Sequence, residues 1–205
     1  MDNYMEKMIV SGDVYLVIRS MKQVGWGAIR ETSVNRILYM SAVVYSFRFP
    51  ERENMFQNDY HFFITLSGPE ETLVQGALVN LESNEIIEHM EEGYRLVELK
   101  EIENYSFLPR YVEKKAWIED MAYIIGIYGE DKIYDFIFRD PEYKTSLESN
   151  NEYNLDIGGD NQTIKFLNQF KKMFEDQTDG AAQLDNRKYL ELYFEYVFGR
   201  ILRGE

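Results

Sequence analysis

Residues 67–99 read SGPEETLVQGALVNLESNEIIEHMEEGYRLVEL, and this stretch decides the fold that we expect. Its first residues, Ser67-Gly68-Pro69-Glu70, have the pattern of a capping box with proline at the start of a helix. In such a box the serine oxygen accepts a hydrogen bond from the Glu70 amide and the glutamate reaches back. The apolar residues that follow have helical spacing. They are Leu73, Ala77, Leu78 and Leu81. The sequence therefore predicts a helix that ends at Ser83-Asn84.

A two-stranded hairpin is predicted directly after this helix. Ile86-Ile87 begins the first strand, Glu91-Glu92-Gly93 forms the turn, and Tyr94, Leu96 and Val97 return as the second strand. A helix followed at once by such a hairpin is the second half of a winged helix. We therefore expect a mainly α protein with a small β wing, in which a winged helix is followed by a helical C-terminal half.

Helical patterns also occur on both sides of this stretch. The first helix is predicted over about 14–22 with Ser11-Gly12-Asp13 as its cap, and the second over about 34–47 with Thr32-Ser33 as its cap. A boundary at 100–109 divides the chain into a winged-helix domain, 1–108, and a helical domain, 109–205, which can pack as one unit. In the second domain we expect helices at about 111–128, 130–138, 162–174 (capped by Asp160) and 187–202, an exposed loop at 139–159 and a linker at 175–185.

The charge of the chain restricts its partners. Its 205 residues carry a net charge of −14, which repels phosphate backbones and anionic membrane surfaces. There is no cysteine, so neither a disulfide framework nor a thiolate zinc site is available. The N-terminus is acidic and lacks the basic region of a signal peptide, and the longest apolar run, 122–128, is too short to span a bilayer. We expect a cytoplasmic protein.

The acidic charge is concentrated in the predicted winged helix. No lysine or arginine occurs from Glu53 to Tyr94, a segment with nine acidic residues. Winged helices that read DNA carry basic residues on the second helix and the wing. We therefore expect this edge to contact protein and not DNA, with Glu70, Glu71 and Glu82 as a charged patch that faces a basic partner.

The last predicted helix is apolar around most of its circumference, which indicates burial on more than one side. Such a helix is either central to its own domain or covered by another chain. For the second case, the residues predicted to dock a partner are Tyr189, Tyr193, Tyr196 and Phe198.

Two histidines, His61 and His89, are the only ones in the chain, and their spacing does not suggest a metal site. Asp156 to Asn161 has some features of a calcium loop but lacks the alternating oxygen ligands and the closing glutamate. We interpret the histidines as structural and Asp160 as a helix cap.

A nuclease-like pattern also occurs. Glu142-Tyr143-Lys144, behind Asp135 and Asp140, matches the tail of a metal-dependent nuclease motif. That chemistry needs carboxylates at strand ends around a divalent cation, whereas this triplet lies in a predicted loop. We interpret it as a solvated charge run, and we expect no catalytic, cofactor-binding or metal-ligating residues and no enzyme activity.

Three segments together resemble a known family. They are Arg36 to Ala42, the helix and wing from Ser67 to Leu96, and Tyr128-Gly129-Glu130 through Tyr143. They resemble the middle components of bacterial ABC three-component (Lamassu-type) anti-phage systems and the related Panacea antitoxin domain. The resemblance implies a small non-catalytic subunit, without a cofactor, that lies between an SMC-like ATPase and an effector, often a nuclease.

Other functions stay open from the sequence. A Panacea-type antitoxin would neutralise a toxin by direct binding. A transcription regulator would bind duplex DNA, against which the missing basic residues argue. A metal-dependent nuclease would depend on Glu142.

Overall fold

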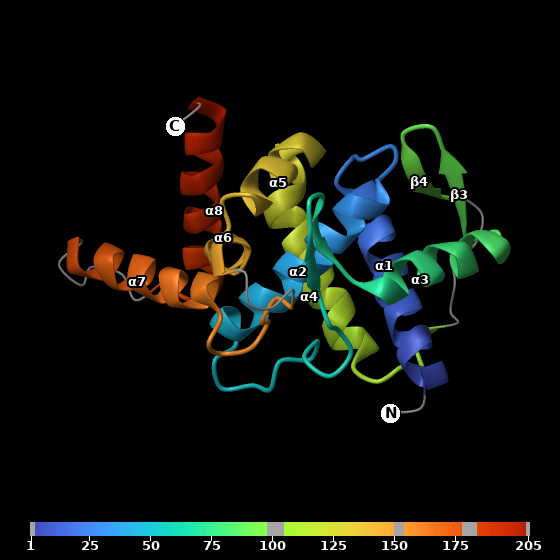
Figure 1. Cartoon of the computed structure of the whole chain (residues 1–205), viewed down its shortest axis with the longest axis horizontal. Helices are drawn as coiled ribbons and strands as arrows, with labels where there is room; N and C mark the ends of the chain where they lie inside the picture. Colours follow the sequence, from blue (N-terminus) through green and yellow to red (C-terminus); the bar gives the residue numbers. More distant parts are fainter. Residues whose placement is uncertain (1–2, 98–104, 150–153, 178–183, 204–205) are drawn as a thin grey trace.

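The computed structural model describes residues 3–97, 105–149, 154–177 and 184–203. These residues form a mainly helical protein with two small antiparallel sheets (Figure 1). In chain order the elements are α1 (Asn3–Gln23), α2 (Glu31–Arg48), β1 (Phe63–Thr65), β2 (Gly68–Glu70), α3 (Thr72–Ser83), β3 (Ile87–Met90), β4 (Gly93–Leu96), α4 (Tyr111–Ile125), η2 (Gly126–Tyr128), α5 (Glu130–Ile137), α6 (Pro141–Ser149), α7 (Gln162–Gln177) and α8 (Asn186–Arg203). The predicted mainly α fold with a small β hairpin is confirmed.

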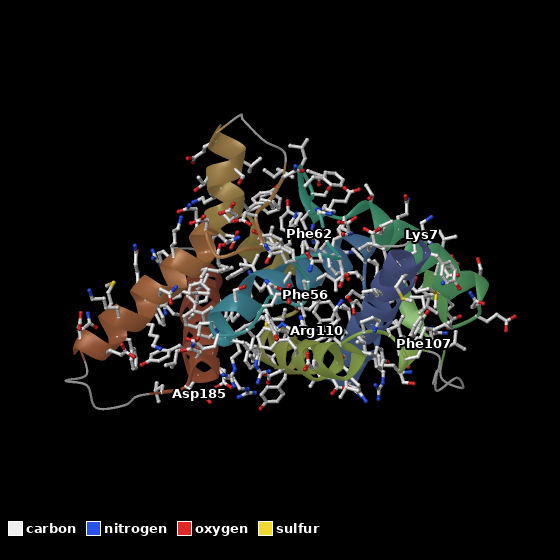
Figure 2. All side chains as sticks on the ribbon, turned by 90° about the horizontal axis from the view of Figure 1, so that it is seen from below. Lys7, Phe56, Phe62, Phe107, Arg110 and Asp185 are labelled. Atoms are coloured by element: carbon white, nitrogen blue, oxygen red, sulfur yellow. The ribbon has the colours of Figure 1, made fainter. Side chains whose placement is uncertain are left out.

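Helix α2 lies in the middle of the molecule, and α1, α3, α4, α5, α7 and α8 pack around it (Figure 1). Every residue from Ser33 to Tyr45 is buried. Phe56 and Phe62 lie beside this helix (Figure 2), with ring centroids 6.2 Å from Tyr45 and 5.5 Å from Tyr39 respectively. A helix covered on all sides has no solvent-facing stripe. The sequence predicts this property for the last helix, but α2 is the helix that has it.

The predicted hairpin is confirmed as β3 and β4, which pair antiparallel with Ile87 opposite Leu96. Ile29, between α1 and α2, extends this sheet by one bridge. Its N–H donates to the Tyr94 carbonyl at 2.9 Å, and the Tyr94 N–H donates back at 2.8 Å. Gly93 has φ of +134°, and a Cβ there would lie 2.4 Å from the Ile29 carbonyl oxygen. Only glycine allows the turn to approach the connection between α1 and α2 so closely.

The predicted capping box is wrong. Gly68–Glu70 forms β2, which pairs antiparallel with β1. Helix α3 begins one residue after Glu71, whose carboxylate caps it by accepting a hydrogen bond from the Leu73 N–H at 3.2 Å. Ser67 instead lies in the turn between the strands, where its carbonyl accepts two hydrogen bonds from the Arg36 guanidinium. Pairing with β1 and binding to the Arg36 guanidinium occupy the backbone groups of this segment, so a helix does not begin here.

The predicted caps of the first two helices are also wrong. Helix α1 begins at Asn3 and runs through Ser11-Gly12-Asp13 without a break. Ser11 and Asp13 are buried there, and Asp13 is satisfied by Lys114 on α4 and by Tyr60. Helix α2 begins at Glu31, before the predicted Thr32-Ser33, and has Arg30 at its N-cap position. Asp13 is tolerated inside α1 because partners from elsewhere in the chain satisfy its carboxylate.

The predicted exposed loop at 139–159 contains a helix, α6. Asp140 begins it by accepting a hydrogen bond from the Tyr143 N–H at 3.0 Å. The cap of α7 is Asn161 and not Asp160, because the Asn161 side-chain oxygen accepts from the Thr163 N–H at 2.8 Å and from the Ile164 N–H at 3.3 Å. The remaining C-terminal helices lie near their predicted places.

Buried apolar residues from both predicted domains belong to one cluster. Helix α4 packs against α1, and α7 and α8 pack against α2. Half of the predicted boundary at 100–109, residues 100–104, lies outside the described residues, as does the middle of the predicted linker at 175–185. The division into two domains therefore stays a prediction.

Candidate functional site

The exposed side of α3 and the β3–β4 hairpin form a surface that we call the acidic edge. The hairpin turn and the end of α3 place acidic side chains in solvent there, with Glu88 half-buried. Arg95 is the only basic residue from Thr72 to Leu96, and its guanidinium pairs with Glu88. Lys22 of α1 lines a pocket together with Glu88 and Arg95. The positive charges of Lys22 and Arg95 therefore lie on the side of the hairpin that faces α1. The acidic side chains are Glu82, Glu85, Glu88, Glu91 and Glu92.

The structure does not bring the predicted charged patch together. Glu82 is exposed near the C-terminal end of α3, and Glu70 is half-buried in β2 before its N-terminal end. Glu71 is buried, and its second carboxylate oxygen accepts a hydrogen bond from the His61 N–H at 2.6 Å. The prediction that Glu71 faces a partner is therefore corrected: it is a structural cap. Of the three residues, Glu82 alone belongs to the acidic edge.

The predicted docking face of the last helix is mostly core. Tyr189 and Phe198 are fully buried, and Tyr193 is 2% exposed. The Phe198 ring stacks on Tyr128 with centroids 4.0 Å apart. Of the predicted four residues, only Tyr196 is accessible, with 48% of its surface exposed. The docking role predicted for the other three is corrected, because this chain's own α5, η2 and α7 supply their neighbours.

Tyr196 lines an apolar groove between α7 and α8, which we call the α7–α8 groove. It has a volume of about 610 Å³. One wall is formed by Phe166, Phe170 and Met173, which lie four and three residues apart on α7, and the other by Leu192 and Tyr196 on α8. Met173 is 61% exposed. The helical spacing of the sequence predicts Phe170 and either Met173 or Phe174 as inward-facing, and the structure places Phe174 against the core and Met173 in solvent. The extra apolar position at Phe166 is the signal of a second, open face.

Side chains considered for catalysis have structural partners. The Glu142 carboxylate accepts a hydrogen bond from the Gln162 N–H at 2.7 Å, at the start of α7. Asp140 accepts from Tyr39, from Thr163 and from the Tyr143 N–H, and its burial raises the pKa of its carboxyl to about 6. These contacts join the starts of α6 and α7 to α2.

Candidate metal ligands are dispersed. His61 and His89 are exposed, and the His89 ring lies 4.7 Å from that of Tyr94. Asp156 uses its carboxylate to accept from the Gly158 N–H at 2.7 Å, as in an Asx turn. Within the described residues, no group of three or more histidine, aspartate or glutamate side chains is arranged to hold a metal ion.

No helix in the described parts of the chain has both the length and the apolar character needed to cross a membrane. Comparison with protein-family models, with curated proteins and with solved structures finds no match to this chain. Its function is therefore argued from its own surfaces.

Proposed function

We propose that this protein is a non-catalytic adaptor that joins two other proteins. The observation that supports this function best is the placement of two surfaces of different chemistry. The acidic edge lies at one end of the long axis of the molecule, and the α7–α8 groove lies at the other (Figure 1). An adaptor must hold two partners at once without a clash, and surfaces at opposite ends meet that requirement.

We interpret the N-terminal half as a winged helix. Its elements follow in the order α1, the bridge residue Ile29, α2, the β1–β2 pair, α3 and the β3–β4 hairpin, and Ile29 pairs with β4. Helix α3 precedes the hairpin directly and packs against α1 and α2. In this interpretation α3 and the hairpin occupy the places that contact DNA in nucleic-acid-binding members of this class.

The charge of the acidic edge favours a protein partner. Nucleic-acid binding draws most of its affinity from lysine and arginine at phosphates, and a carboxylate surface repels them. Complementary charge instead favours a basic protein surface and speeds its association. We therefore propose that a basic partner binds across Glu82, Glu91 and their neighbours.

The α7–α8 groove is suited to an amphipathic helix from the second partner. The apolar residues of α7 that line it, the exposed Phe166 and Met173 with the half-buried Phe170 between them, follow at intervals of four and three positions, which is the spacing at which one helix presents anchors to another. Aromatic and methionine side chains are enriched in such contacts. Tyr196 on α8 gives the groove an aromatic wall with a polar end.

The resemblance to Lamassu-type middle components suggests which kinds of protein the two partners are. On that basis we propose an SMC-like ATPase and an effector nuclease as the two proteins, in a bacterial antiviral complex in the cytoplasm. The same resemblance extends to Panacea antitoxins, for which a single toxin would be the partner.

Co-purification with a candidate SMC-like ATPase and a candidate effector nuclease tests the proposal. We expect Glu82→Lys combined with Glu91→Lys to release one partner and Met173→Glu to release the other. Glu148→Lys, which reverses an exposed charge on α6, is the control and should retain both. Retention of both partners by both test variants would overturn the adaptor proposal, as would capture of a solitary toxin alone or salt-dependent binding of duplex DNA at the acidic edge.

A further inference from the structure

A pocket of about 510 Å³ lies between the end of α2, the residues that follow it and α4, away from the acidic edge and the α7–α8 groove. Four aromatic rings line it, and three of them pack against one another. The Trp117 ring lies 5.7 Å from both Tyr45 and Phe49, measured between centroids, and those two rings are 4.9 Å apart. The Trp117 indole N–H donates to the Ser41 carbonyl at 2.8 Å, which fixes its orientation.

Two arginines line this pocket. The guanidinium carbons of Arg48 and Arg52 each lie 4.8 Å from the centroid of the Phe49 ring. Within the described residues, neither guanidinium has an ion pair with a carboxylate. The Arg48 Nε is buried and has no hydrogen-bond partner there. A buried donor without an acceptor is costly, so this atom marks a place where a ligand acceptor would be favourable.

The carboxylates at the same pocket are paired with other arginines. Asp120 binds Arg187 on α8 at 2.7 Å. Glu119 lies 3.7 Å from Arg19, and Glu113 lies 3.8 Å from Arg110. Within the described residues these carboxylates therefore leave Arg48 and Arg52 without an ion-pair partner, although all five charged side chains line the same pocket. The two guanidinium groups without a carboxylate partner point to an anionic ligand.

We propose that this pocket binds a nucleoside monophosphate. The two guanidinium groups offer planar donors suited to a phosphoryl group. Tyr123 on α4, which lines the pocket and is 64% exposed, offers a ring on which a base stacks. The volume lies in the range of small-molecule sites. Aromatic rings and guanidinium groups in one pocket favour a ligand that has both a base and a phosphoryl group over an acidic segment of a protein partner.

Titration calorimetry with the full chain tests this inference. The probes are the monophosphates of adenosine, guanosine, cytidine and uridine, with inorganic phosphate, the free nucleosides and an acidic peptide as comparisons. We expect at least one monophosphate to bind roughly tenfold more tightly than inorganic phosphate and than its own nucleoside. Binding should also change the fluorescence of Trp117, measured in a Trp26→Phe variant in which it is the only tryptophan.

Arg48→Ala and Arg52→Ala should each weaken the binding about tenfold, as expected when a charge-assisted hydrogen bond is lost. Arg30→Ala is the matched control, because Arg30 pairs with Glu130 and does not line the pocket. Binding of none of the probes, tighter binding of the acidic peptide, or equal affinity of all three arginine variants would overturn the inference. Capture of protein partners is measured separately, so failure here is distinguishable from failure of the adaptor proposal.

Discussion

The Lys114 ammonium on α4 donates to the Asp13 carboxylate on α1 at 2.7 Å, and both side chains are 2% exposed. Asp59, from the segment after α2, accepts a second hydrogen bond from the same ammonium at 2.9 Å. Burial by itself would lower the pKa of Lys114, but the two carboxylates outweigh burial and raise it. A charged lysine therefore joins three separate parts of the chain inside the core.

Replacement of Lys114 by methionine should strongly destabilise the protein. It would leave two buried carboxylates facing each other, and loss of one partner from a buried ion pair costs about 3–5 kcal/mol. Lys115→Met is the control, because the neighbouring lysine forms no ion pair within the described residues and is half-buried. Urea unfolding of both variants gives the measurement. Equal transition midpoints would show that the buried ion pair is dispensable.

Asp140 should make stability depend on pH. Burial raises the pKa of its carboxyl from 3.8 to about 6 in the folded protein. The folded state therefore favours the protonated form, and this contribution is fully present below about pH 3.8 and is lost as pH rises through about 6. From that shift we expect Asp140 to lower the free energy of unfolding by about 3 kcal/mol over this interval.

The variant Asp140→Asn should lose most of that pH dependence, because asparagine keeps an acceptor oxygen but cannot ionise. The measurement is the free energy of unfolding by urea at several pH values from 4 to 8, for the variant and the original chain. Asp160→Asn removes a carboxylate that is 98% exposed and serves as the control. A variant whose pH profile parallels that of the original chain would refute this role for Asp140.

Alanine substitutions at two glycines in the N-terminal half should change the stability of the protein in opposite directions. Gly93→Ala would place a Cβ against the Ile29 carbonyl at a positive φ, which we expect to cost about 1–3 kcal/mol. Gly76 lies on the exposed face of α3, where a Cβ would meet open space, and alanine there should stabilise the helix by about 0.5–1 kcal/mol. Thermal unfolding should show the two midpoints moving in opposite directions. Parallel shifts would mean that the close approach of Gly93 to Ile29 does not constrain the hairpin.

Aspartate substitutions at two tyrosines of α8 should have different effects on stability, because one tyrosine lies in the core and the other on the surface. Tyr193 contacts Phe136 and Phe170 inside the core, so Tyr193→Asp should cost about 3–5 kcal/mol or more. Tyr196→Asp should change stability by less than about 1 kcal/mol, because nearly half of that side chain is exposed. Chemical denaturation gives both values. Similar losses would contradict the placement of Tyr196 at an open groove. If the adaptor proposal holds, Tyr196→Asp should also release a partner while the chain stays folded.

The predicted hairpin is confirmed because its signals are local. Glycine at position 93 and the strand residues on either side are typical of a tight turn, and these signals lie within a few neighbouring residues. The capping box failed for the opposite reason. Its serine and proline have the local pattern of a helix start, but β1 pairs with this segment and Arg36, 31 residues earlier, binds the Ser67 carbonyl. Local propensity is overridden where tertiary partners use the same backbone groups.

The proposed binding surfaces also differ in how far the sequence predicts them. The acidic edge follows from the charges along one continuous segment, so sequence alone predicts its sign. The α7–α8 groove and the pocket at Arg48 and Arg52 each need a second element to form. Trp117 and Tyr123 lie more than 60 residues after those arginines, and no spacing within the sequence relates them.

The sequence by itself determined the helical class, the hairpin and the negative charge, because periodicity, turn residues and ionisable groups act over a few neighbouring residues. Only the tertiary structure decided which helix is central, which tyrosines of α8 are buried and which arginines have no carboxylate partner among the described residues. Burial and pairing depend on what other elements place against a side chain, and that contact is absent until the whole chain has packed around α2.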